Sequence, residues 1–92
     1  MSPKDTPTAV CEFIVNEVID KNKLDEDSWD NHIVGYIKDN PDEEIIITLS
    51  ACRKCGIDVP KAGDHLWIRY DGRFVETIPL EFGNIYSIEY MN

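Results

Sequence analysis

Three consecutive isoleucines constrain the fold of this chain more than any other feature of its sequence. In the segment EEIIITLSA, residues 43–51, Ile45, Ile46 and Ile47 follow one another directly. Successive side chains of a strand point to opposite faces of its sheet, so this strand turns apolar side chains to both faces. We therefore expect residues 43–51 to form a strand that is covered on both faces.

Two segments before this strand have helical features. In TAVCEFIVNEVIDKNK, residues 8–23, the apolar positions recur at helical spacing, and Thr6 and Pro7 fit a helix cap and first helical position. The second segment, residues 28–39, is ambiguous between a helix and a short strand over residues 33–37. Acidic residues at its front and Asn40-Pro41 at its end favour the helix. The first helix would bury one stripe of residues: Val10, Cys11, Ile14, Val15, Val18 and Ile19.

The rest of the chain has the patterns of strands. Residues 64–70 alternate between apolar and polar, and Asp71-Gly72 predicts a tight hairpin to residues 73–79. Residues 84–91 form a last predicted strand. Helices followed by strands are typical of an α+β fold, in which two N-terminal helices pack on a small three- to four-stranded antiparallel sheet. With 92 residues, we expect a single domain over residues 1–92.

The charge of the chain restricts the class of partner. Eighteen acids against nine bases give a net charge of −9. Direct binding to a nucleic-acid backbone needs clustered Lys and Arg, and an anionic membrane would repel the chain. A basic protein would be attracted. Residues 20–44 contain nine of the acids and three lysines, so we expect an acidic surface there.

This acidic surface is the predicted partner-binding site. Trp29 and Tyr36 would serve as anchors, since aromatic residues are favoured at binding hot spots. The function predicted from it is that of a small acidic, non-enzymatic module, monomeric or homodimeric. It would act as an inhibitor or adaptor that occludes a basic surface of a larger partner, such as a nucleic-acid-binding surface, as inhibitors encoded by viruses and mobile elements do. The predicted contact residues are Asp25, Glu26, Asp27, Trp29, Asp30, Tyr36, Asp39, Asp42, Glu43 and Glu44.

The spacing Cys-x-x-Cys at Cys52 and Cys55 leaves three interpretations open. A zinc-stapled module, the main alternative function, would use both thiolates and His65, with Cys11 or His32 as the fourth ligand. A redox pair is disfavoured because Gly56 and the residues after it do not continue a helix. In the third interpretation, the two cysteines are reduced residues of a loop, and the protein binds no cofactor.

Other motifs favour neither catalysis nor secretion. The sequence contains no nucleophile elbow, phosphate-binding glycine loop or His-Glu-x-x-His motif, so we do not expect an enzyme. The start MSPKDTPTAV lacks the pattern of a secretion signal, and no apolar run reaches the length of a membrane helix. Three cysteines are an odd number, which disfavours a disulfide framework. We therefore expect a cytoplasmic location with reduced thiols.

A family resemblance supplies a further alternative. The stretch EIIITLS…GIDVPKAGDHLWIRYDG…ETIP resembles the strand core of the stringent starvation protein B family over about half of the chain. Members of that family are adaptors that deliver tagged proteins to a protease, so the resemblance implies a peptide-binding adaptor. They dock on the protease through a long C-terminal tail, whereas this sequence ends at Asn92, and so delivery is not expected.

Overall fold

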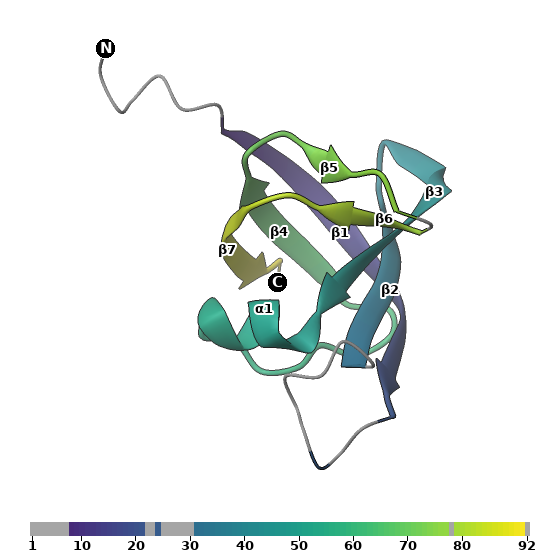
Figure 1. Ribbon diagram of the computed structural model, residues 1–92, viewed down its shortest axis with the longest axis vertical. Helices are drawn as coiled ribbons and strands as arrows, with labels where there is room; N and C mark the ends of the chain where they lie inside the picture. The colour runs from purple at the N-terminus through teal and green to yellow at the C-terminus, as the bar shows by residue number, and fades with distance from the viewer. Residues whose placement is uncertain (1–7, 22–23, 25–30, 78, 92) are drawn as a thin grey trace.

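The computed structural model describes residues 8–21, 24, 31–77 and 79–91, which form a curled sheet and one short helix (Figure 1). No helix in these ranges has the length and apolar character that a membrane crossing requires. The elements in chain order are β1 (Ala9–Asp20), β2 (Asn31–Ile37), β3 (Asn40–Thr48), α1 (Leu49–Lys54), β4 (His65–Tyr70), β5 (Phe74–Val75), β6 (Leu80–Phe82) and β7 (Ile85–Tyr90).

The predicted α+β fold is wrong, because the described part of the chain is mostly β. Both segments predicted as N-terminal helices are strands, β1 and β2. The sheet has seven strands in the order β5-β6-β3-β2-β1-β4-β7, rather than three or four. It is also mixed, because β6 runs parallel to β3 while the other neighbours are antiparallel.

A β-bulge explains why the first strand has helical spacing. The register of β1 against β2 shifts between Val15 and Glu17, so one extra residue interrupts the alternation of the strand. Phe13 and Val15, which are 0% and 1% exposed, are therefore followed on the inner face by half-buried Val18. Spacings of two and then three residues resemble the period of a helix. The predicted helical stripe does not contain Phe13, although this residue is fully buried.

The second strand follows the alternative interpretation, in which residues 33–37 are extended. Ile33 and Val34 are both buried, so β2 is covered on both faces and lacks the alternation that would have identified it. Gly35 weakened the helical pattern in the sequence, and the packing of the strands explains why a glycine is needed at this position. A Cβ atom there would collide with the backbone oxygen of Ile14 and would lie 2.6 Å from the Phe13 ring. The glycine therefore lets β2 lie close to β1 where the sheet curls.

The prediction of a strand covered on both faces is confirmed. Ile45, Ile46 and Ile47 are 2%, 5% and 1% exposed, and β2 and β6 flank them. The strand ends earlier than predicted, because Thr48 caps helix α1. The Thr48 hydroxyl accepts a hydrogen bond from the Ala51 N–H at 3.3 Å.

The segment that contains β6 and β7 closes the sheet. β6 pairs with β3, and β7 pairs with β4 at the other end of the sheet, yet only Gly83 and Asn84 separate the two strands. The sheet therefore curls into a small barrel around one core (Figure 1). If β6 and β7 are counted as one strand and the two-residue strand β5 is set aside, the connectivity resembles that of the OB-fold, a five-stranded Greek-key barrel.

The hairpin predicted at Asp71-Gly72 is wrong, although a turn is present. β4 pairs with β1 and β7, whereas β5 pairs with β6. The Asp71 carboxylate accepts hydrogen bonds from the Arg73 N–H at 3.0 Å and from Asn84 Nδ2 at 3.2 Å. Burial acts to raise the pKa of Asp71, but these hydrogen bonds lower it overall. Asp71 thus connects the end of β4 to Asn84, which lies between β6 and β7. The strands predicted at 64–70 and 84–91 are confirmed as β4 and β7.

Candidate functional site: an acid-rimmed groove beside β3

A large bulge presents acidic side chains at the start of β3. Gly35 pairs with Ile45 and Ile37 pairs with Asn40, so four residues of β3 lie opposite the single residue Tyr36 of β2. Proline fits such a position, because it cannot donate a hydrogen bond to a neighbouring strand. Bulges of this kind redirect side chains and are common beside binding sites. The four residues of the bulge are exposed: Pro41, Asp42, Glu43 and Glu44.

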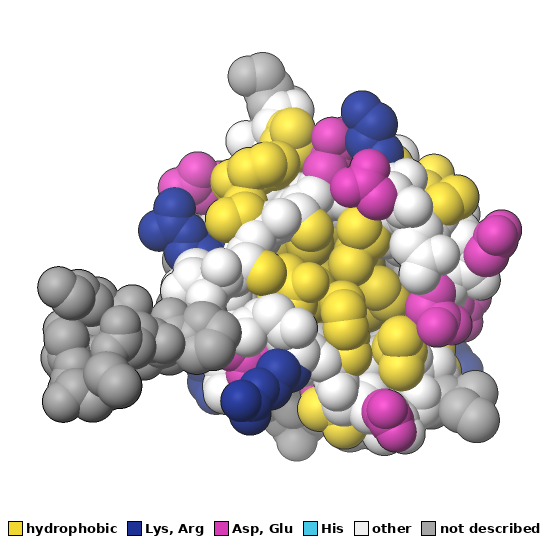
Figure 2. Space-filling view, turned by 90° about the horizontal axis from the view of Figure 1, so that it is seen from above, with side chains coloured by type: hydrophobic (Ala, Val, Ile, Leu, Met, Phe, Trp, Pro, Cys, Tyr) yellow, Lys and Arg dark blue, Asp and Glu magenta, His cyan; other side chains and the backbone are white. Residues whose placement is uncertain are grey.

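Beside this bulge lies a hollow of about 590 Å³, which we call the acid-rimmed groove. Its apolar part is held in place by the core, since the Phe74 ring centroid lies 5.4 Å from that of Tyr70 and 5.3 Å from that of Phe82. Figure 2 shows the face at this end of the barrel, where apolar side chains gather and Asp and Glu side chains, with some Lys and Arg, lie around them. The groove is lined by Glu43, Phe74, Glu76, Thr77, Pro79 and Leu80.

The electrostatics of this end of the barrel favour a cationic ligand. Two of its bases already have acidic neighbours: the Lys38 ammonium lies 3.7 Å from the Glu12 carboxylate, and Arg73 lies near the Asp71 carboxylate. Like charges held close together repel, and a bound cation would reduce that repulsion. The exposed acids at this end are Asp39, Asp42, Glu43, Glu44 and Glu76.

The predicted partner-binding residues are only in part brought together. Four of them, Asp39 and the bulge residues Asp42, Glu43 and Glu44, lie at the β2–β3 end of the barrel. Tyr36 is half-buried on β2, opposite the bulge. The acidic segment is divided, because Asp20 pairs with Asn31 at the other end of β2. The remaining predicted residues lie outside the described residues: Asp25, Glu26, Asp27, Trp29 and Asp30.

Two acids beside β3 were missed by the sequence analysis. Both lie far from the acidic segment in sequence: parallel pairing places Glu81 opposite Ile46, and Glu76 lines the groove with Glu43. Val75 pairs with Glu81, which places the end of β5 next to β6. Parallel pairing between distant segments has no local sequence signal, so periodicity could not have shown this part of the site.

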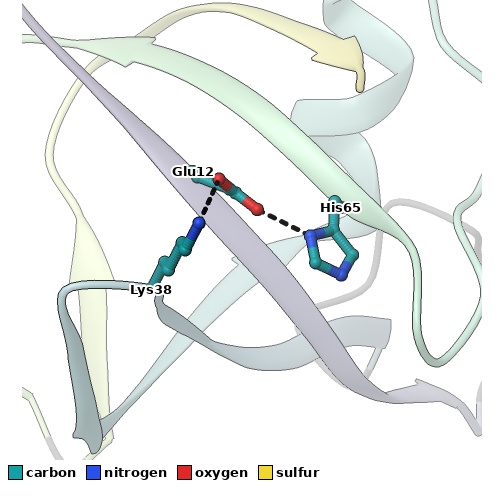
Figure 3. A network of polar contacts seen from close by, with 3 residues as sticks. All are labelled: Glu12, Lys38 and His65. Atoms are coloured by element: carbon teal, nitrogen blue, oxygen red, sulfur yellow. Dashed lines mark hydrogen bonds and ion pairs between the residues drawn. The ribbon is translucent and has the colours of Figure 1, made fainter. Parts of the chain in front are cut away.

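A second polar cluster lies on the outside of the barrel, on β1 and its neighbours (Figure 3). The Glu12 carboxylate accepts a hydrogen bond from Nδ1 of His65 at 2.6 Å, and its other oxygen lies 3.7 Å from Lys38 Nζ. The hydrogen bond with His65 is the main cause that lowers the pKa of Glu12, against the effect of burial. The three residues come from β1, the β2–β3 turn and β4, so this cluster has no sequence motif.

The predicted zinc ligands do not meet. Cys52 is buried in α1, Cys55 follows the end of this helix, and His65 donates to Glu12 on the outside of β4. Burial raises the pKa of Cys52 to about 11 and also raises that of Cys55. Across the ranges that the structure describes, no three potential ligands are grouped for a metal ion. The zinc module stays a prediction.

Cys52 lies on a helix and Cys55 caps its end, whereas a loop was predicted for both. Residues 49–54 form α1, and Leu49 and Cys52 pack from it into the core. Cys11 is half-buried on β1, where burial and then the charge of Asp39 raise its pKa to about 11. Thiols with raised pKa values are poor nucleophiles and poor metal ligands at neutral pH.

Comparison of the chain with protein-family models, with curated proteins and with solved structures gives no match. The resemblance to the stringent starvation protein B family therefore gains no support from these comparisons. The function has to be argued from the geometry and charge of the site.

Proposed function

We propose that the protein is a small non-enzymatic binding module that captures a cationic, partly apolar segment of a larger protein in the acid-rimmed groove. By covering that segment it would act as an inhibitor or adaptor. One observation carries the proposal: Glu43 on β3 and Glu76 after β5 line the same groove as apolar Phe74 and Leu80.

The two kinds of surface have separate roles in this proposal. Apolar side chains of the partner would lose contact with water on Phe74 and Leu80, at about 25 cal/mol per Å² of buried apolar surface. The carboxylates would select basic side chains and accelerate association at low salt. The fixed position of Phe74 against the core limits the loss of side-chain freedom on binding.

The charge of the chain supports a protein partner over a nucleic acid. Barrels with OB-type connectivity often bind oligonucleotides, but a fold does not by itself determine function. A net charge of −9 and the exposed acidic bulge would repel a phosphate backbone. The same charge would attract the basic surface with which another protein binds nucleic acid. This is the occluding function that the sequence predicts.

A defined peptide tests the proposal. The probe is a fluorescein-labelled ten-residue peptide in which Arg and Leu alternate, and the comparison peptide carries Gln in place of Arg. Fluorescence anisotropy should show binding of the Arg peptide alone, and the affinity should fall as salt is raised. Equal binding of both peptides would contradict the electrostatic part of the proposal.

Matched variants distinguish the groove from a general attraction to negative charge. The variant E43Q/E76Q removes two carboxylates from the groove, and the control E17Q/D20N removes two exposed carboxylates from β1. Both variants have the same net charge. We expect the first to lose at least about tenfold in affinity, because charge-assisted contacts are lost, and the control to stay within about threefold of the wild type. Equal losses would locate binding outside the groove.

A further inference from the structure

A second, more enclosed cavity lies between α1 and the β6–β7 segment. Its volume is about 240 Å³, and its walls come from the end of β3, from α1 and from residues 81–85. It is separate from the acid-rimmed groove, because the successive residues Leu80 and Glu81 point to opposite faces of β6. Leu80 lines the groove, whereas Glu81 lines this cavity.

Glu81 is an unusual acid, because it is half-buried. Burial is the cause that raises its pKa. Within the described ranges, its carboxylate has no hydrogen bond and no ion pair. A partly buried charge without a partner is unfavourable, and a cation placed against it would offset that cost. The position of Glu81 on the wall of a cavity therefore suits a ligand with an ammonium group.

Groups of the opposite polarity line the α1 side of the same cavity. Lys54 brings an ammonium, and Ser50 brings a hydroxyl group that lies 3.2 Å from the hydroxyl of Thr48. Lys54 has no ion pair with Glu81 among the described residues. An anionic group of a ligand would find both a positive charge and a hydrogen-bond donor on this side.

The cavity also has apolar lining, and its space is small. Ile46 and Ile85 line it together with polar Thr48 and Asn84. Its volume of about 240 Å³ lies below the range of about 300–1,000 Å³ that is usual for drug-sized ligands. A compact molecule with a short apolar group fits these limits.

We propose that this cavity binds a small zwitterion of the amino-acid class, with its ammonium group on Glu81, its carboxylate on Lys54 and Ser50, and a short apolar side chain against Ile46 and Ile85. The site goes beyond the proposed capture of a partner segment and does not depend on it. The protein would thus carry a small-molecule site beside its protein-binding groove.

Titration with four related compounds tests the assignment. L-valine is the probe, N-acetyl-L-valine removes the ammonium charge, L-valinamide removes the carboxylate, and L-norvaline changes the shape of the side chain only. Chemical shifts of the ¹⁵N-labelled protein at neutral pH report the binding. The protein should bind L-valine with a Kd of about 1 mM, a value that is reasonable for a ligand of this size. The largest shifts should fall on residues 48–55 and 81–85, and the acetyl and amide analogues should each bind at least about tenfold more weakly.

Paired variants connect each charge of the ligand with its residue. Lys54→Met should weaken L-valine binding at least about tenfold and should no longer distinguish L-valine from L-valinamide. Glu81→Gln should likewise weaken L-valine binding at least about tenfold, and this variant should no longer distinguish L-valine from N-acetyl-L-valine. Lys61→Met and Glu17→Gln remove charges elsewhere and should leave the affinity within about twofold. Denaturant unfolding confirms that each variant is folded.

Three results would overturn the proposal. The first is no shift with L-valine at about twenty times the expected Kd. The second is equal binding of L-valine and of the two analogues that each lack one of its charges. The third is a set of shifts outside the cavity. Because the peptide assay probes the groove on the other face of β6, failure here would leave the result for the groove unaffected.

Discussion

The Glu12 carboxylate lies 2.6 Å from Nδ1 of His65, although 53 residues separate the two in the sequence. The contact crosses from β1 to β4, which are paired neighbours in the barrel. It therefore joins the first strand of the chain to a strand that forms after α1. Because Glu12 also lies near Lys38, one carboxylate connects three segments.

This contact predicts a pH dependence of stability. The pKa of Glu12 is lowered in the folded protein, first by the hydrogen bond from His65. The ionised carboxylate therefore adds to stability above its ordinary pKa of about 4.3, and this contribution is lost as the pH falls through the lowered value. In urea unfolding, the stability difference between the wild type and Glu12→Gln should be largest near neutral pH and should shrink in acid. Glu89→Gln is the control, and a difference that does not change with pH would contradict this account.

Gly35 should tolerate no larger residue. A methyl group there would meet the Ile14 backbone and the buried Phe13 ring, so Gly35→Ala forces β1 and β2 apart. We expect a loss of about 1–3 kcal/mol or more in the free energy of unfolding, as in other overpacked cores. Urea unfolding with an unchanged m-value measures it. A loss below about 0.5 kcal/mol, typical of surface substitutions, would mean that the two strands are not so close.

The thiols should react slowly in the folded protein. Burial raises the pKa values of Cys11 and Cys52 to about 11. Only the thiolate reacts with iodoacetamide, so at about pH 8 both should be alkylated about a hundredfold more slowly than in the unfolded chain. Mass spectrometry of digested samples gives the rate for each cysteine. Fast alkylation of Cys52 in the native protein would indicate an exposed or activated thiol.

Zinc should not copurify in a stoichiometric amount. A structural zinc site needs deprotonated thiolates and four grouped ligands, whereas Cys52 is buried and His65 is bonded to Glu12. Metal analysis of protein purified without a histidine tag makes the measurement. One zinc ion per chain that disappears in Cys52→Ala would instead establish the zinc-stapled module.

Two neighbouring aromatic residues should separate stability from binding. Phe82 is 3% exposed and contacts the rings of Phe13, Tyr70 and Phe74, so Phe82→Ala should cost about 3–5 kcal/mol of stability. Phe74 is half-buried and lines the groove, so Phe74→Ala should cost less stability but should greatly weaken binding of the Arg–Leu peptide. If both variants are folded under the assay conditions and weaken peptide binding to the same extent, the peptide does not bind in the groove.

The local patterns of the sequence predicted those strands that have regular neighbours. β4 alternates without interruption, and the three isoleucines of β3 showed a strand covered on both faces. The failures lie where the chain departs from regular pairing. The bulge in β1 imitates the spacing of a helix, and β2 is buried on both faces around Gly35, so neither strand shows a period of two.

Only the part of the candidate site that is contiguous in the sequence was predictable. Asp42, Glu43 and Glu44 are adjacent in the sequence, and a cluster of acids before a buried strand indicates an exposed acidic surface. Glu76 and Leu80 join them only through the parallel pairing of β6 with β3, which depends on contacts between distant segments. The apolar part of the groove therefore could not be derived from periodicity.

The segment of residues 80–90 determines when the barrel can be completed during synthesis. Until it leaves the ribosome, the outer edges of β3 and β4 both lack their β6 and β7 partners. A nascent chain that ends before this segment would expose two open strand edges, which are sites of aggregation. The barrel should accordingly be completed only after residues 80–90 have left the ribosome.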